Sequence, residues 1–238
     1  MRLSVAGCSA LGGRETNQDS WYADDRLITV ADGVGGAPAG DVASRLAVES
    51  TAASGPDMPP EETANRANAA VRAYASTDPA THGMATTLVL AVLCGDGTVR
   101  GAHVGDSVTL VQTDRVEFLG SPHTLGAELV AAGHLTAEEG ARHPNRRALV
   151  RAVGMDATVQ ADTWERPAVV GERYLLCSDG LTDALDDDVF LAALAGLRAA
   201  DPRQCVETLV RLACEAGARD NVTAVVGDVV IGDPAWRR

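Results

Sequence analysis

The stretch from Leu27 to Gly36 constrains the fold most. A run of apolar and β-branched residues ends abruptly in Asp32, and three glycines follow within four residues. Such a run predicts a buried β-strand. A carboxylate at the end of a buried strand is costly unless it is paired or binds a metal, and glycines allow a tight turn close to a ligand. A plain strand followed by an Asp-Gly turn would also explain this stretch alone.

The same pattern recurs in distant parts of the chain. Hydrophobic runs end at Asp106 and Asp179, Asp19 lies in a polar turn, and Asp220 comes just before the last apolar run. Acids at strand ends and turns can converge on one point, and clustered carboxylates repel each other unless cations are present. Ligand sets made only of oxygen suit Mg²⁺ or Mn²⁺ better than zinc or copper.

Bulk properties limit the possible classes of function. A chain of 238 residues with 46% hydrophobic content can form one domain with a sizeable core. Its net charge of −13 argues against nonspecific binding to nucleic acids or to anionic membranes. The five cysteines lack Cys-x-x-Cys spacing, which argues against disulfides and structural zinc. This cysteine pattern fits a reducing cytosol, and no apolar run reaches membrane-spanning length. We therefore expect a cytoplasmic protein.

The order of the expected elements is strands, two helices, strands, two helices and a strand. This order predicts an α+β fold in which two antiparallel sheets pack face to face with helices outside, a four-layer α-β-β-α sandwich. Short strands between residues 86 and 119 predict an antiparallel meander. The helices are expected at 42–53, 60–76, 187–199 and 202–216.

The chain is expected to be a single domain spanning residues 1–238. Residues 121–151 contain short helical segments that do not join the sheet pattern, so we expect a helical excursion over the surface. Residues 233–238 are expected to form a loose tail.

Six short motifs follow one another in the chain. They are Arg14-x-x-Asn17-Gln18-Asp19, Ala31-Asp32-Gly33-x-Gly35-Gly36, Gly83-Met84-Ala85-Thr86-Thr87, His103-Val104-Gly105-Asp106-Ser107, Ser178-Asp179-Gly180-Leu181-Thr182-Asp183 and Asp220-Asn221-Val222-Thr223. Each is weak alone, but together and in this order they resemble the metal-dependent protein phosphatases of the protein phosphatase 2C type, in their compact bacterial form. The resemblance covers about residues 3–230.

The resemblance implies a helix-flanked β-sandwich with two bridged Mn²⁺ or Mg²⁺ ions in a cleft between the sheets. By position, Asp32 would bridge the metals and the carbonyl group of Gly33 would bind one of them. Asp179 and Asp220 would hold the other metal. Asp19 would act at the first metal site through water molecules.

A third metal site and a phosphate-binding residue follow from the same resemblance. Asp106 and Asp183 would match the weaker third site of the family. Two cations about 4 Å apart lower the pKa of a bridging water, so that hydroxide can attack phosphorus directly near neutral pH. Arg14 and Asp32 are the catalytic candidates, and Arg14 would bind phosphate because its planar guanidinium can hold two oxygens at once.

Residues 121–151 resemble the family's flap beside the active site, and we call them the flap segment. It carries Arg142, Arg146 and Arg147 in an otherwise acidic protein. These arginines are expected to attract acidic surroundings of a phosphorylated substrate segment; a solvated basic helix face is the alternative.

The chain also departs from the family pattern. Val108 stands where the family usually has Arg, Ala37 where many bacterial members have His, and Ala85 where Gly is usual. These departures could change the rate, third-metal affinity or substrate choice.

The resemblance implies a monomeric phosphatase that hydrolyses phosphoserine and phosphothreonine and opposes bacterial Ser/Thr kinases. Its partners would be phosphorylated proteins, among them the kinases and their targets. One alternative is a degenerate phosphatase domain that binds phosphoproteins or a regulatory partner. Another is a metal-dependent hydrolase of small phosphate esters. The intact acids argue against the binding module, because binding alone does not need a costly carboxylate cluster.

Overall fold

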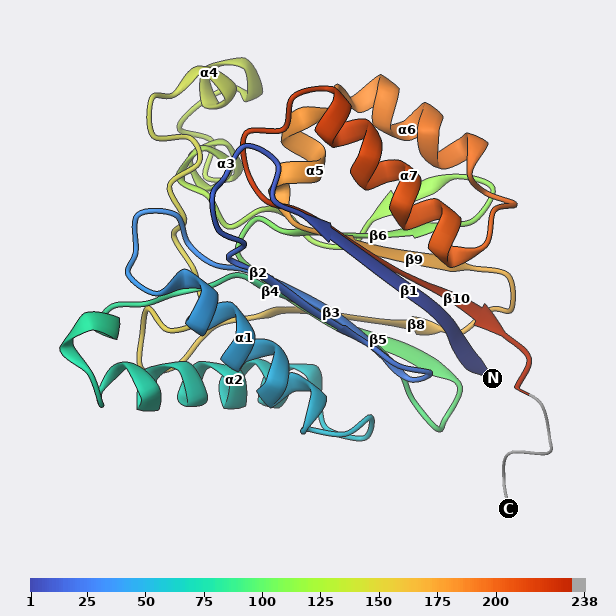
Figure 1. The fold of residues 1–238 in the computed structure, drawn as a ribbon, viewed down its shortest axis with the longest axis horizontal. Helices are drawn as coiled ribbons and strands as arrows, with labels where there is room; N and C mark the ends of the chain where they lie inside the picture. Colours follow the sequence, from blue (N-terminus) through green and yellow to red (C-terminus); the bar gives the residue numbers. More distant parts are fainter. Residues whose placement is uncertain (233–238) are drawn as a thin grey trace.

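The computed structural model describes residues 1–232 and contains two five-stranded antiparallel sheets packed face to face (Figure 1). The strand order is β1-β10-β9-β6-β7 in the first sheet and β2-β3-β4-β5-β8 in the second. The expected sandwich of sheets between helices is therefore confirmed. The tail expected at 233–238 lies outside the described residues.

The strands account for most of the apolar runs in the sequence. They are β1 (Arg2–Ala10), β2 (Asp19–Ala23), β3 (Leu27–Asp32), β4 (Leu88–Leu93), β5 (Thr98–Val104), β6 (Val108–Gln112), β7 (Val116–Phe118), β8 (Asp162–Pro167), β9 (Arg173–Cys177) and β10 (Val222–Val230).

The helices lie on the outer faces of the two sheets and at one end of the sandwich (Figure 1). The helices within residues 40–75 cover the second sheet, and those within residues 179–215 cover the first. The described helices are α1 (Gly40–Ala52), α2 (Pro60–Ala75), α3 (Leu125–Ala131), α4 (Ala137–Arg142), α5 (Asp179–Ala184), α6 (Asp187–Gly196) and α7 (Pro202–Glu215), with a short 3-10 turn at Pro79–Thr81. Among residues 1–232, no helix has the length and apolar character needed to cross a membrane.

Three apolar layers separate the four layers of secondary structure. Alternation along each strand places successive side chains on opposite faces of its sheet. In β3, Ile28 and Val30 pack between the sheets, whereas Leu27 and Ala31 pack beneath the helices on the outer face. Both faces of the strand are therefore buried, which explains its nearly continuous apolar sequence.

A buried ion pair anchors the first sheet to the connection between α6 and α7. The Arg173 side chain is 1% exposed and donates from Nε and Nη2 to the two carboxylate oxygens of Asp228, at 2.7 and 2.8 Å. It also donates to the carbonyl oxygens of Leu197 and Ala200. The guanidinium is thus fully surrounded by acceptors, which burial of an arginine requires.

The predicted meander between residues 86 and 119 is wrong. β4 pairs with β5 and β6 pairs with β7, but β5 and β6 belong to different sheets. The chain crosses from the second sheet to the first at residues 105–107. The helix expected at 187–199 is shorter and ends at Gly196. The short helix α5 was not expected, because six residues give too little periodicity to recognise.

The flap segment contributes no strand to either sheet. It contains α3 and α4, and Thr136 with Glu139 forms the capping box that begins α4. An isolated bridge between Thr124 and Leu149 brings the two ends of the segment together. In Figure 1 it lies at the end of the sandwich away from the N-terminus, beside α5.

Candidate active site

Asp19 and Asp32 lie directly opposite each other in the antiparallel pair β2–β3. Two threonines of the chain entering β4 hold the backbone of Asp32. Its N–H donates to Thr87 Oγ1 at 2.9 Å, and its carbonyl accepts from Thr86 Oγ1 at 2.8 Å. The pairing register and these bonds place two carboxylates side by side at the end of the second sheet.

Ser178 connects these acids to the first sheet. It follows β9, and its Oγ donates to Asp19 Oδ2 at 2.8 Å. Asp179, the next residue, begins α5, and Asp183 lies one helical turn later on the same face. The acids predicted from separate motifs are therefore brought to the same end of both sheets.

Asn221 fixes the loop that carries Arg14. Its Oδ1 accepts from the N–H of Gln18 at 2.8 Å, and its Nδ2 donates to the carbonyl oxygens of Leu11 and Thr16. Three contacts from one side chain hold a loop from the start of the chain against the start of β10. This role explains why an asparagine follows Asp220.

Arg14 lies against an acid that was expected to bind metal. Its Nη2 donates to Asp220 Oδ2 at 2.7 Å, and both side chains are less than half exposed. The tight packing of the loop supports this placement, because a Cβ on Gly12 would lie 1.9 Å from the carbonyl oxygen of Asp220.

Asp106 is carried by the crossing between the sheets. Gly105 has a φ of +102°, and a Cβ there would lie 2.6 Å from Thr87 Cγ2. Only glycine tolerates both conditions without strain. Ser107 Oγ lies 2.7 Å from Thr87 Oγ1, so the crossing is bonded to the same threonine that holds Asp32.

Four of the predicted acids line one small cavity. It has a volume of about 220 Å³ and includes Asp32, Asp106, Asp179 and Asp220 in its wall. Arg147, Ala148 and Leu149 of the flap segment complete it. Asp19 lies behind Asp32, and Asp183 pairs with Arg147 at the margin. The sequence did not predict that Arg147 lines this cavity, because it shows the charge of the residue but not where the flap segment places it.

Burial and mutual repulsion raise the pKa of these carboxyl groups. Burial, followed by the charges of Asp106, Asp183 and Asp220, raises the pKa of Asp179 to about 7. Burial raises the pKa of Asp106 to about 6 and, together with the nearby acids, raises that of Asp32 well above its ordinary value. The folded chain therefore holds several carboxyl groups where ionisation is unfavourable unless positive charge is supplied.

The donor set fits hard divalent cations. All of the predicted side-chain ligands are carboxylates, and Asp19 Oδ1 is a buried oxygen without a hydrogen-bond partner in the described structure. Within residues 1–232, however, no three acidic, histidine or cysteine side chains already converge as ligands of one ion. The carboxylates of Asp220 and Asp183 are instead paired with Arg14 and Arg147.

Gly33, predicted as a carbonyl ligand, lies where the chain leaves β3. Its N–H donates to the carbonyl of Gln18 at 3.1 Å, and an isolated bridge pairs it with Thr86. A Cβ at this position would lie 2.5 Å from the carbonyl carbon of Gly40. Glycine is required here for close packing, and metal binding by its carbonyl stays a prediction.

The three flap arginines have different surroundings. Arg142 pairs with Glu138 on α4, and Arg147 pairs with Asp183. Arg146 packs its Cβ near Gly126. Arg146 and Arg147 lie in the turn after α4, so a basic helix face does not describe them; docking of substrate by these residues stays a prediction.

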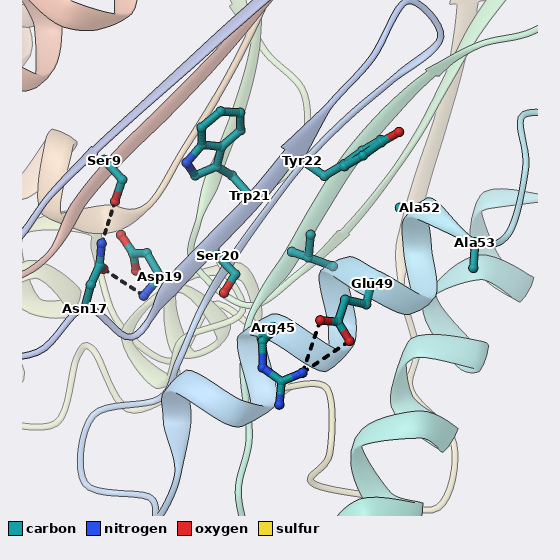
Figure 2. Close-up of a pocket in the computed structure, with 11 residues that line it drawn as sticks. Ser9, Asn17, Asp19, Ser20, Trp21, Tyr22, Arg45, Glu49, Ala52 and Ala53 are labelled. Carbon is teal, nitrogen blue, oxygen red and sulfur yellow. Dashed lines mark hydrogen bonds and ion pairs between the residues drawn. The ribbon is translucent and has the colours of Figure 1, made fainter.

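A second hollow lies behind Asp19, between β2 and α1, with a volume of about 680 Å³. Figure 2 shows Asn17 between Ser9 and Asp19 at its edge: Asn17 Nδ2 donates to Ser9 Oγ at 2.8 Å, and its Oδ1 accepts from the N–H of Asp19 at 3.1 Å. Trp21 lines the same hollow. Asn17 therefore positions the backbone of Asp19 from the side opposite the acidic cavity.

Known proteins that resemble this chain are phosphatases. The sequence profile of protein phosphatase 2C matches residues 6–212. The chain is 37% identical over 225 residues to the serine/threonine protein phosphatase PstP of Mycobacterium tuberculosis, covering 91% of this chain and 43% of that protein. It is 33% identical over 212 residues to the serine/threonine phosphatase stp of Listeria innocua, covering 84% of this chain and 83% of that one.

A crystal structure of the catalytic domain of PstP with two manganese ions resembles this fold with a TM-score of 0.83 and 34% identity, covering 97% of this chain and 99% of that one. The chain belongs to the protein phosphatase 2C family. It spans less than half the length of the Mycobacterium tuberculosis relative.

Proposed function

We propose that this chain is a metal-dependent protein phosphatase that hydrolyses phosphoserine and phosphothreonine and thereby opposes Ser/Thr kinases. The observation that carries the proposal is the meeting of Asp32, Asp106, Asp179 and Asp220 in the wall of one cavity. These acids come from four separate motifs, and a bound cation would offset their mutual repulsion and favour their ionised forms.

The site residues have distinct proposed roles. Asp19, Asp32, the carbonyl of Gly33, Asp179 and Asp220 would hold two Mn²⁺ or Mg²⁺ ions, with Asp106 and Asp183 available for a third. Bound cations of this kind supply an activated water molecule and neutralise charge on the phosphoryl group. Manganese in the PstP crystal structure supports this assignment.

Arg14 would bind the phosphoryl oxygens. Its Nη2 is engaged by Asp220, but a guanidinium has five N–H donors in a planar fork. The side chain is 46% exposed, so its remaining donors are accessible to a ligand. Asp220 then orients the guanidinium, and the two residues act together.

The proposed partners are phosphorylated proteins, including the kinases that modify them, and the proposed active form is a monomer. The names of the relatives, which are serine/threonine phosphatases, favour protein substrates over small phosphate esters. The intact set of acids favours an enzyme over a degenerate binding module.

Hydrolysis of a phosphothreonine peptide with Mn²⁺, with Mg²⁺ and with EDTA tests the proposal. We expect metal-dependent turnover that falls at least about a hundredfold in Asp32→Ala, since loss of even a supporting residue of a metal site costs about 10–100-fold. Asp114→Ala is the matched control, because Asp114 is exposed in the turn between β6 and β7. No turnover by folded, metal-loaded protein would favour the binding module, and turnover of small esters alone would favour the ester hydrolase.

A further inference from the structure

A larger cavity adjoins the acidic one. It has a volume of about 840 Å³ and lies between α3 and α4 of the flap segment, the hairpin β6–β7, and α5. Asp106, Asp179 and Arg147 line both cavities. A substrate whose phosphorylated residue lies at the acids therefore has its neighbouring residues within reach of the larger cavity.

The cavity exists because small residues face it from the flap segment. Ala127 and Ala131 of α3 and Ala137 and Ala141 of α4 contribute only methyl groups to its wall. The two helices approach closely at Gly140, where a Cβ would lie 2.4 Å from Val130 Cγ2. Larger residues at the alanine positions would fill the space.

The opposite wall is also apolar at two positions. Val108 of β6 contributes a branched apolar side chain to this wall. Phe118 of β7 lines the cavity and is 52% exposed. A half-exposed phenylalanine is unremarkable alone, but here it borders a cavity that alanine and valine side chains also line.

The rim beside the acids carries charges of both signs. Asp183 is paired with Arg147, and Arg146 lies in the same turn of the flap segment. Asp187, at the start of α6, adds a further negative charge. Because charges of both signs lie at the rim, the rim does not favour a charged side chain of either sign. The alanine, valine and phenylalanine side chains of the cavity favour an apolar one.

We propose that this cavity binds an apolar side chain that flanks the phosphorylated residue, so that the enzyme selects phosphoproteins with a large aliphatic residue at one position near the phosphosite. The inference rests on the proposed phosphatase function and specifies its substrate class. Burying such a side chain in an apolar pocket changes kcat/KM by about tenfold or more.

The test uses a set of phosphothreonine peptides in which leucine, serine or arginine occupies one flanking position at a time. kcat/KM is measured with Mn²⁺ for the whole chain and for Ala131→Leu, which fills the cavity from α3. Ala132→Leu is the matched control, because Ala132 is exposed at the end of the same helix but does not line the cavity. Ala141→Leu fills the cavity from α4 and replaces Ala131→Leu if that variant does not fold.

We expect leucine to exceed serine by about tenfold at one flanking position in the unchanged chain and in Ala132→Leu. In Ala131→Leu and Ala141→Leu this preference should fall below about twofold, while hydrolysis of p-nitrophenyl phosphate is unchanged. The absence of a leucine preference, a preference for arginine, or a leucine preference that survives both filling variants would overturn the inference while leaving the phosphatase intact. If the unchanged chain shows no metal-dependent hydrolysis at all, even of p-nitrophenyl phosphate, the proposed function and the inference are both overturned.

Discussion

The carboxyl group of Asp179 should destabilise the metal-free protein at neutral and alkaline pH. Its pKa rises from the ordinary value of 3.8 to about 7 on folding. At about 1.4 kcal/mol per pKa unit, this shift lowers the free energy of unfolding by roughly 4 kcal/mol when the pH is above both the unfolded and the folded pKa. Because neighbouring acids share the titration, we expect the effect of removing this one charge to be about half as large.

The variant Asp179→Asn keeps the shape of the side chain and removes its charge. A group whose pKa is raised on folding binds its proton more weakly in the unfolded chain, so stability is lost as the pH rises from about 4 to about 7. At pH 8 in EDTA, the variant should be more stable by about 2 kcal/mol, a rise in Tm of roughly 4–8 °C for a chain of this size. Near pH 4 the gain should almost disappear.

Thermal unfolding at pH 4 and pH 8, with EDTA and with Mn²⁺, measures these effects. Manganese should raise the Tm of the unchanged chain at pH 8, because a ligand that binds only the folded state stabilises it, and should raise that of Asp179→Asn much less. Asp114→Asn is the control for removal of an exposed carboxylate. A Tm of Asp179→Asn at pH 8 in EDTA equal to or below that of the unchanged chain would refute the reasoning.

Two further predictions concern ion pairs. Arg147→Gln removes the partner of Asp183. Because the pair is partly exposed, this change should alter the free energy of unfolding by less than about 1 kcal/mol. It should nevertheless speed amide exchange in the flap segment. Arg142→Gln, which breaks only a pair on α4, should leave that exchange unchanged, and equal exchange in both variants would contradict a role of Arg147 in holding the flap. Asp228→Asn removes the charge that balances buried Arg173 and should cost about 3–5 kcal/mol in urea unfolding. A cost below about 1 kcal/mol would show that the two carbonyl acceptors suffice.

The acids of the site could be predicted from sequence because each follows or precedes a strong local signal. Asp32 ends an apolar run, and so does Asp179. Because the strands of both sheets end at the two ends of the sandwich, the convergence of Asp32 with Asp179 is expected from these local patterns. The opposition of Asp19 and Asp32 is a matter of register. Register is set where only one face of a strand is buried, but β3 is buried on both faces, so its apolar sequence does not determine the register.

The choice between the two sheets could not be predicted. β5 and β6 are separated by only a few residues and resemble the arms of a hairpin. The positive φ of Gly105 and its close contact with Thr87 turn the chain into the other sheet. Glycine is compatible with a hairpin turn and with a crossing alike, so the tertiary contact with Thr87 decides between them.

Arg14 shows why long-range partners limit a prediction of chemistry. Its motif predicted that Arg14 binds phosphate. Nothing near Arg14 in the chain predicted its ion pair with Asp220, which lies 206 positions away. The ion pair is compatible with the predicted role, because Nη2 is the only part of the guanidinium bonded to a carboxylate in the described structure. A cation bound by Asp220 would share that carboxylate with Arg14, so we expect metal affinity and the orientation of the proposed phosphate-binding group to be coupled through one side chain.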